Sequence, residues 1–403
     1  MEYVRFGELY SIPSSNGVSR PSAVRGAGYK MINMGELFAN NIISEMPMER
    51  VRLSQKEKEK FLVKENDLLF ARQSLVAEGA GKCSIVKQLG EETTFESHII
   101  RVRLNEEICD PWFYYYLFQL PYNPVKTIVN QCAQAGIRGK ELVKIKVPLP
   151  SIKIQKIIAN ALATYDELIE NNNKRIKLLE QLAENLYKEW FVRFRFPGYE
   201  NAKFENGLPE GWERRRISAY YDTCSGGTPS RTREEFFVAG IYPWVKTGEI
   251  KDCIIIDTEE YITKEAVKKS SAKLLPAKSL AMAMYGVNIG QLGYFDKQMT
   301  CNQACCVFSD KRSFSSKHYL FQYLKSIREY LLLISFGAAQ QNLSQELIKK
   351  IKIVMPSDDV VRAFDEKVDA IYDSIKTLMY KNQNLAKQRD LLLPRLMSGK
   401  LEV

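Results

Sequence analysis

The stretch Ile158-Ala-Asn-Ala-Leu162-Ala-Thr-Tyr165-Asp-Glu-Leu-Ile169-Glu-Asn-Asn172 begins a pattern of side chains that recur at alternating gaps of four and three residues. The pattern continues to Trp190, and Asn172 fills the one polar slot in it. Such an a/d heptad seam predicts a helix of about 33 residues, or ~50 Å. The same spacing returns 206 residues later, from Phe364 to Leu396, and Asn382 is a polar residue of this second seam.

Two seams in one chain predict two long helices that pack on each other as a coiled coil. We expect them to run antiparallel, because two similar modules in one chain would relate by a pseudo-two-fold axis, as in a fused dimer. The two asparagines either fix the register or reach out of a loose seam into solvent. The predicted seam residues are Ile158, Leu162, Ile169, Asn172, Ile176, Leu179 and Leu186, followed by Val368, Ile375, Leu378, Asn382, Leu385 and Leu392.

The segments before the two helices also repeat. Residues 29–37 align with 242–250, and residues 141–150 align with 346–356. Short apolar runs separated by Gly, Asn and Pro predict strands, with one clear helix in each copy, at 110–119 and 316–325. We therefore expect an α+β (mixed α/β) chain with an internal repeat: module 1 at 1–150, helix 151–196, linker 197–211, module 2 at 212–356 and helix 357–403.

Composition narrows the class of protein. The 403 residues suggest two or three domains, and 45% hydrophobic with 26% charged residues is typical of a globular chain. No run approaches the ~20 apolar residues of a membrane span. Lys and Arg exceed Asp and Glu by 58 to 48, for a net charge of +10, which fits either a polyanionic partner or simple solubility. The eight cysteines form no CxxC pair, so we expect free thiols in a reducing cytoplasm and no bound metal.

Catalytic motifs are missing from the sequence. The only histidines are His98 and His318, and no GxSxG motif occurs, so a histidine-based triad is poorly supported. Residues 77–83 resemble a phosphate loop, but Cys83 stands where Ser or Thr would bind magnesium, and a turn is the better interpretation. We expect a chain that is not an enzyme and that binds no cofactor itself.

Polar and basic loops recur in both modules and are candidate DNA contacts. Arg, Lys, Asn and Gln can pair with base edges in the major groove, and neighbouring cations can hold phosphates. Any one of these residues could also belong to an ordinary solvated loop. The candidates are Arg20, Arg25, Lys30, Arg72, Gln73, Ser74, Arg138 and Lys140 in module 1, and Thr228, Ser230, Arg231, Arg233, Lys246, Tyr285, Asn288, Gln340, Gln341 and Asn342 in module 2.

The whole layout resembles the specificity (S) subunit of Type I restriction–modification systems. The resemblance spans nearly the whole chain and rests on Leu208-Pro-Glu-Gly-Trp-Glu213, Gly227-Thr-Pro-Ser230, residues 242–249, residues 337–356, the two helices and Arg395-Leu-Met-Ser-Gly-Lys-Leu401. Module 1 departs from this pattern, because it lacks the Pro-Glu-Gly-Trp start and has Gln134-Ala-Gly-Ile-Arg138 where module 2 has Gln340-Gln-Asn342. This difference suggests a separate half-site for each copy.

The resemblance implies two target recognition domains, each reading one half of a bipartite, asymmetric double-stranded DNA target. The helices would set the spacer and dock two modification (M) subunits, which use S-adenosylmethionine for adenine-N6 DNA methylation. Two restriction (R) subunits would add endonuclease activity that depends on ATP and Mg2+, in host defence within the prokaryotic cytoplasm. The alternatives are a non-catalytic coiled-coil scaffold that binds proteins rather than DNA, and a fused methyltransferase or nuclease.

The end of the first helix allows two interpretations. Trp190 and Phe191, with Phe194 and Phe196, form an apolar group. This group is either part of a docking surface for M subunits or a plug in the core of the protein.

Overall fold

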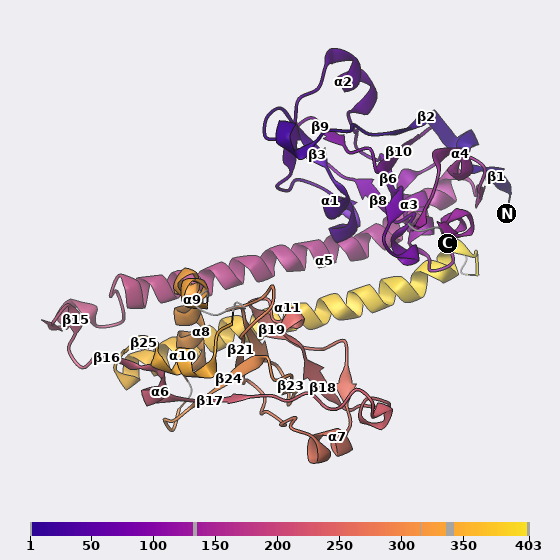
Figure 1. The fold of residues 1–403 in the computed structure, drawn as a ribbon. Coiled ribbons are helices and arrows are strands. Elements are labelled where there is room, and N and C mark those ends of the chain that lie inside the picture. Colours follow the sequence, from indigo (N-terminus) through magenta and orange to yellow (C-terminus); the bar gives the residue numbers. More distant parts are fainter. Residues whose placement is uncertain (1, 132–134, 315, 336–341, 401–403) are drawn as a thin grey trace. The chain divides into compact units, whose positions relative to one another are not determined.

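The computed structural model describes residues 2–131, 135–314, 316–335 and 342–400 (Figure 1). The chain forms two compact units, Met1–Ile169 with Asn384–Val403, and Glu170–Gln383. Each unit holds one module together with part of each long helix, α5 (Ile152–Tyr187) and α11 (Asp358–Met397). The predicted boundaries set the helices apart from the modules, whereas in the structure the helices contribute to the compact units themselves. Within the described residues, no helix is both long and apolar enough to span a membrane.

Module 1 is built on a five-stranded sheet of order β2-β10-β6-β8-β4. All pairs are antiparallel except β4 with β8, and the central strands β6 and β8 are buried along their whole length. Helix α3 (Pro111–Gln119) contributes Phe113, Tyr114 and Phe118 to the core beside this sheet. The strands are β2 (Tyr10–Asn16), β10 (Ile99–Leu104), β6 (Leu68–Ala71), β8 (Cys83–Val86) and β4 (Ile42–Ile43).

Three smaller sheets and three short helices complete module 1. The sheet orders are β5-β3-β9, β11-β12-β7 and β1-β13. Their strands are β5 (Glu49–Val51), β3 (Tyr29–Ile32), β9 (Thr93–Phe95), β11 (Asn130–Gln131), β12 (Ala135–Gly136), β7 (Gln73–Ser74), β1 (Tyr3–Arg5) and β13 (Lys146–Pro148). The helices are α1 (Met34–Ala39), α2 (Gln55–Phe61) and α4 (Gly139–Leu142).

Module 2 repeats this topology. Its five-stranded sheet has the order β17-β24-β21-β22-β19, and β19 again pairs in parallel at the edge. A three-stranded sheet β20-β18-β23 and a pair β16-β25 match β5-β3-β9 and β1-β13. The internal duplication predicted from sequence is therefore confirmed. The strands are β17 (Tyr221–Ser225), β24 (Cys305–Asp310), β21 (Leu280–Ala283), β22 (Leu292–Phe295), β19 (Cys253–Ile255), β20 (Tyr261–Ile262), β18 (Tyr242–Val245), β23 (Thr300–Cys301), β16 (Glu213–Arg216) and β25 (Lys352–Met355).

Short helices cover module 2, and a hairpin lies ahead of it. The hairpin joins β14 (Phe204–Glu205) to β15 (Leu208–Pro209). The helices are α6 (Ile217–Tyr220), α7 (Lys264–Lys269), α8 (Lys317–Ser326), α9 (Arg328–Ser335) and α10 (Gln345–Lys350). The predicted start of α3 is confirmed in module 1, because the Asp110 side chain accepts a hydrogen bond from the Phe113 N–H at 3.1 Å and Pro111 opens the helix.

The two long helices pair antiparallel in the second unit. Asn172 is 8% exposed, and its Nδ2 donates to Oδ1 of Asn382 at 2.8 Å. Further along α5, the Tyr187 ring packs against Phe364 at 6.4 Å, so partner numbers on α11 fall as numbers on α5 rise. Nδ2 of Asn382 donates to Oδ1 of Asn173 at 2.8 Å. The asparagines therefore pair within the seam, as the register interpretation predicts.

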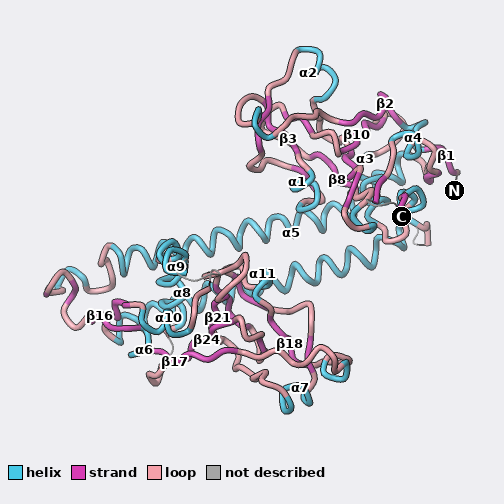
Figure 2. The backbone as a smooth tube through the Cα atoms, in the orientation of Figure 1, coloured by secondary structure: helices cyan, strands magenta, loops and turns pink. Residues whose placement is uncertain are grey.

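The same helices also contact each other in the first unit. Arg389 of α11 pairs with Asp166 of α5, and Asp166 also accepts a hydrogen bond from the Tyr116 hydroxyl at 2.6 Å. Leu162 and Leu396 share the core cluster that includes α3. Figure 2 shows α5 and α11 as unbroken helical tubes. The predicted seam residues are all buried or half-buried.

The apolar end of α5 belongs to the core of the second unit. A π-helical turn (Lys188–Val192) ends the helix. The Phe191 ring lies 4.7 Å from Tyr319, 4.8 Å from Phe364 and 5.8 Å from Trp212. Trp190 is buried in the same cluster. Of the two interpretations of this end, the core plug is therefore confirmed, because these rings are already covered by the chain's own side chains.

Candidate nucleic-acid interface

Loops far apart in sequence meet at one end of the five-stranded sheet of module 1. Ala71 ends β6 and Ile99 begins the antiparallel β10, so the loops that follow and precede them lie at the same end. The backbone N–H of Arg72 donates to the His98 carbonyl at 2.8 Å, and the Ile137 N–H donates to the Arg72 carbonyl at 2.9 Å. A further loop is tied in by the Val18 N–H, which donates to the Phe95 carbonyl at 2.8 Å.

Module 2 builds the same loop end with equivalent backbone bonds. The Met284 N–H donates to the Ala304 carbonyl, and the Leu343 N–H donates to the Met284 carbonyl, each at 2.8 Å. The Gly227 N–H donates to the Cys301 carbonyl at 2.8 Å. The two loop ends therefore share a backbone framework while their side chains differ. Such an arrangement can present two different sets of contacts from one scaffold.

The loop end of module 1 contains a hollow of about 530 Å3, lined by Arg72, Gln73, Asn130, Gly136, Ile137, Arg138 and Glu141. It brings together three residues that the sequence predicted as DNA contacts, from segments more than 60 positions apart. Guanidinium and amide groups are the side chains that pair with guanine and adenine edges. Lys140, another predicted contact, is exposed at the start of the adjoining helix α4.

Gln73 has a partner that the sequence did not reveal. Its Oε1 lies 2.8 Å from Nδ1 of His98, and β7, which carries Gln73 and Ser74, pairs with Gly136 and Ala135 of β12. In the tautomer that protonates Nδ1, the histidine donates to Oε1, and the amide nitrogen of Gln73 remains available to donate to a base. His98 could not be identified as a site residue from the sequence, because a lone histidine at the start of a strand has no characteristic spacing.

Three predicted cations of module 1 are already paired inside the module. Arg20 contacts Glu57, Arg25 contacts Glu49, and Lys30, which is 9% exposed, contacts both Glu45 and Glu91. The hydrogen bond to Glu45 raises the pKa of Lys30. The pKa of Glu57 is lowered to about 2, first by the backbone N–H of Ser54 and then by Arg20. A phosphate would compete with carboxylates for these cations, so we expect Arg72, Arg138 and Lys140 to contribute more to DNA affinity.

The predicted cations of module 2 are paired in the same way. Arg231 forms an ion pair with Glu260, which raises the pKa of its guanidinium, and it lies over the rings of Phe237 and Trp244, with its Cζ 4.6 and 4.9 Å from their centroids. Lys246 contacts Glu259 at 2.9 Å and Glu260 at 3.0 Å. Arg233 contacts Glu235 at 2.7 Å. These pairs hold the three cations beside carboxylates around the three-stranded sheet of module 2.

Of the remaining predicted residues of module 2 that the structure describes, two lie at the loop end and three make hydrogen bonds within the module. Tyr285 forms a β-bridge with Asn342 at the loop end, and both side chains are exposed. The Asn288 amide is used internally, because its Nδ2 donates to the Thr247 carbonyl at 3.0 Å. The Thr228 hydroxyl donates to Gln303, and the Ser230 hydroxyl lies 2.9 Å from that of Thr232. Gln340 and Gln341 lie outside the described residues.

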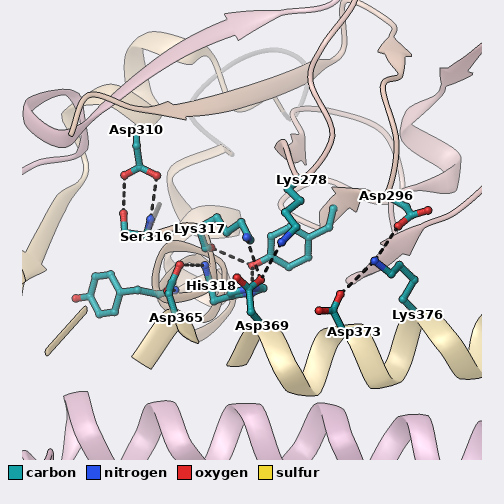
Figure 3. Close-up of polar contacts among 12 residues, drawn as sticks. Lys278, Asp296, Asp310, Ser316, Lys317, His318, Asp365, Asp369, Asp373 and Lys376 are labelled. Carbon is teal, nitrogen blue, oxygen red and sulfur yellow. Dashed lines mark hydrogen bonds and ion pairs between the residues drawn. The ribbon is translucent and has the colours of Figure 1, made fainter. Parts of the chain in front are cut away.

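A separate cluster of charged side chains joins α8 to α11 within the second unit (Figure 3). Asp365 accepts hydrogen bonds from the backbone N–H groups of His318 and Tyr319, at 3.4 and 3.1 Å. These groups lie in the first turn of α8, where no carbonyl of the same helix can accept from them. Burial raises the pKa of Asp365 to about 7. The carboxyl group therefore caps α8 from a neighbouring helix.

His318 extends this cluster. Its Nε2 lies 2.7 Å from Oδ1 of Asp369, and its Nδ1 lies 3.0 Å from the Tyr294 hydroxyl. Burial lowers the pKa of His318 to about 4, and the hydrogen bond from His318 holds the pKa of Asp369 well below its usual range. At neutral pH, a neutral imidazole therefore donates to an ionised carboxylate. The cluster fixes module 2 to its helix.

The cysteines and acidic groups give no metal site within the described part of the chain. Its cysteines are free thiols, and those of module 2 all lie on strands of its sheets. No group of three or more His, Cys, Asp or Glu side chains among the described residues is arranged to hold a metal ion.

Comparison with known proteins gives a consistent result. Residues 1–181 and 209–388 match the family described as Type I restriction modification DNA specificity domain. The Type I restriction enzyme MjaIX specificity subunit of Methanocaldococcus jannaschii is 26% identical over 300 residues, which cover 72% of this chain and 69% of that protein. The MjaVIII specificity subunit of the same organism is 24% identical over 366 residues, covering 88% and 82%. A solved Type-I restriction-modification system S subunit from M. genitalium shares the fold, with a TM-score of 0.57, 14% identity and coverage of 98% and 95%.

Proposed function

Because this chain belongs to the Type I restriction modification DNA specificity domain family, we propose that each of its two modules reads one half of a bipartite, asymmetric DNA target. The resemblance predicted from the sequence is confirmed by this membership. The chain is a DNA sequence-specificity subunit, and the catalytic activities belong to other subunits of the complex. A protein scaffold that ignores DNA is not favoured.

The observation that supports two separate half-sites is the pair of loop ends, which equivalent backbone bonds hold in both modules. Arg72 of module 1 corresponds to Met284 of module 2, and Gln73 corresponds to Tyr285. Base identity is read by side chains and not by the backbone scaffold. Module 1 is therefore suited to a hydrogen-bonding readout by guanidinium and amide groups. Module 2 presents Tyr285 and Asn342 at the matching place.

The long helices are proposed to set the spacer between the half-sites and to dock two M subunits. Within the second unit an asparagine pair in the seam, of which Asn172 is buried, favours one alignment over shifted ones. A fixed register is what a spacer of constant length requires. Two R subunits would complete the complex, and S-adenosylmethionine, ATP and Mg2+ would be used by those partners in the prokaryotic cytoplasm.

Single-molecule sequencing of DNA methylated by the reconstituted complex with M tests this proposal. The expected result is one split motif whose two halves carry adenine methylation. Replacement of Arg72 with Ala should relax one half and leave the other unchanged, whereas equal loss at both halves would contradict the modular reading. Lys64→Ala is the matched control, because it removes an exposed cation from the turn ahead of β6, at the opposite end of that strand, and should alter neither half.

The spacer is tested by a length change in the helices. Deletion of one heptad from both α5 and α11 removes ~10 Å of helix and should shorten the selected spacer. The deletion is placed on seven residues that include no asparagine of the seam, so that the Asn172–Asn382 pair remains. An unchanged spacer would refute the spacer function while leaving half-site reading intact.

A further inference from the structure

The loops that follow β6 and β21 each carry an exposed aliphatic side chain at the same distance from the strand, and the first loop also exposes Val76, at 59%. Leu75 is 89% exposed and Val287 is 97% exposed. Each is the fourth residue after the end of its strand, at Ala71 and Ala283 respectively. The two strands occupy the same place in the two five-stranded sheets, so the two side chains are equivalent by position.

Both loops are held firmly at their bases. In module 1, the Gly81 N–H donates to the Ala71 carbonyl at 2.9 Å, and in module 2 the Gly290 N–H donates to the Ala283 carbonyl at 2.8 Å. Both glycines have a positive φ, of 75° and 77°, a backbone conformation that residues with a side chain rarely adopt. These closures fix the ends of the loops without any contribution from the exposed side chain. Packing therefore does not account for an aliphatic residue at either tip.

One exposed aliphatic residue is ordinary on a protein surface. Here the feature recurs although the loops differ, with nine residues between the closing pair in module 1 (72–80) and six in module 2 (284–289). The surroundings indicate the kind of partner. Leu75 stands on the same loop as Arg72 and Gln73, which line the hollow, and such cationic and amide groups suit a nucleic acid.

We propose that Leu75 and Val287 make apolar contacts with the bases of duplex DNA, one in each half-site. This inference rests on the proposed function and deepens it. Two parts of DNA offer such a surface: the C5-methyl group of thymine in the major groove, and the faces of bases at a step that opens to admit a wedge. Both can be contacted by an apolar side chain that projects from a fixed loop, which is what each module supplies.

The test uses the complex of the full chain with M and the target defined by methylation sequencing. Leu75→Ser and Val287→Ser remove the apolar contact while leaving all charges in place. Ile108→Ser is the matched control, because Ile108 is 44% exposed in a turn at the opposite end of β10. We expect each loop variant to weaken binding of the target duplex by on the order of 10-fold or more, as for loss of a buried leucine or valine contact. The salt dependence should not change, since no phosphate contact is lost.

Two modified duplexes distinguish the sources of the contact. If a thymine methyl is touched, thymine-to-uracil replacement at one position weakens the parent complex but not the corresponding variant. If a step is opened, 2-aminopurine at that step brightens with the parent and not with the variant. Binding by both variants within twofold of the parent would overturn the proposal, and so would a loss traced to failure to retain M. If the parent itself does not discriminate its target from random DNA, the proposed function fails first and the inference fails with it.

Discussion

A buried ion pair in module 1 has no equivalent in module 2, and the duplication suggests how to replace it. Asp67, which is 0% exposed, receives two hydrogen bonds of 2.7 Å from the Arg103 guanidinium. Asp67 immediately precedes β6, and Arg103 lies on β10 beside it. In the equivalent places of β21 and β24, module 2 has Ser279 and Ser309. We therefore expect the double variant Asp67→Ser/Arg103→Ser to fold as module 2 does.

The magnitudes follow from burial. Removing Arg103 costs about 3–5 kcal/mol, because it leaves the buried charge of Asp67 uncompensated, whereas Asp67→Ser leaves an Arg103 side chain that is 20% exposed and should cost less. Asp67→Ser also removes the acceptor of the Lys64 backbone N–H at 2.8 Å. Replacing both partners removes both charges, so we expect the double variant to lose about 1–2 kcal/mol, mainly from lost packing. The two single losses should therefore exceed the double loss by several kcal/mol.

The free-energy changes of the two single variants and the double variant can be measured within module 1 by hydrogen–deuterium exchange. Protection of the β6 and β10 amides reports the free energy of opening in module 1, while β21 and β24 provide an internal control in module 2. Glu235→Gln is a matched control, because Glu235 also pairs with an arginine, Arg233, at 2.7 Å, but both side chains are exposed, and we expect little change. If the double variant lost as much free energy of opening as the two single variants added together, the reasoning would be refuted.

Three further predictions concern the helices, the buried cluster and the DNA contacts. Asn172→Ala and Asn382→Ala should each destabilise the protein by about 1 kcal/mol in urea unfolding, with coupling between them, whereas exposed Asn171→Ala should not; additive losses would count against the pair. Since burial lowers the pKa of His318 to about 4, its contribution to stability is present above pH ~6.5 and is lost as the pH falls toward 4, so His318→Gln should flatten this decline. Asp365, with its pKa raised to about 7, acts in the opposite direction over that range in both proteins, and an unchanged pH profile would exclude the role of His318. Arg138→Ala should lower DNA affinity and reduce the slope of log affinity against log salt by about one if the side chain holds a phosphate, and it should leave the second half-site unaffected.

The helices and their caps could be predicted from the sequence because their signals are local. The heptad spacing marks the seam directly, and an aspartate before a proline marks the start of α3. The apolar group around Phe191 shows the limit of such patterns. Its spacing indicates an apolar face but not what covers that face, and in the structure Tyr319 and Phe364 cover it from positions more than 120 residues away.

The candidate site could be predicted only in part, for a related reason. Sequence identifies which loops are basic, but whether a cation is available depends on carboxylates brought close by the fold. Lys30 and Arg231 meet Glu91 and Glu260 on other segments, whereas Arg138 lines the hollow. His98 was missed because its role depends on the position of Gln73 across the sheet end.

The duplication separates what the fold requires from what each module varies. Both modules keep the strand order, the loop-end backbone bonds and a glycine with positive φ after the central loop, so these features belong to the scaffold. The buried pair of Asp67 and Arg103 is not kept, so the scaffold does not need it. Leu75 and Val287 fit neither class, because they keep an apolar character that the scaffold does not use. A feature that persists without a structural role is best explained by a contact with something outside the chain, and at this end of the sheet that contact is the DNA.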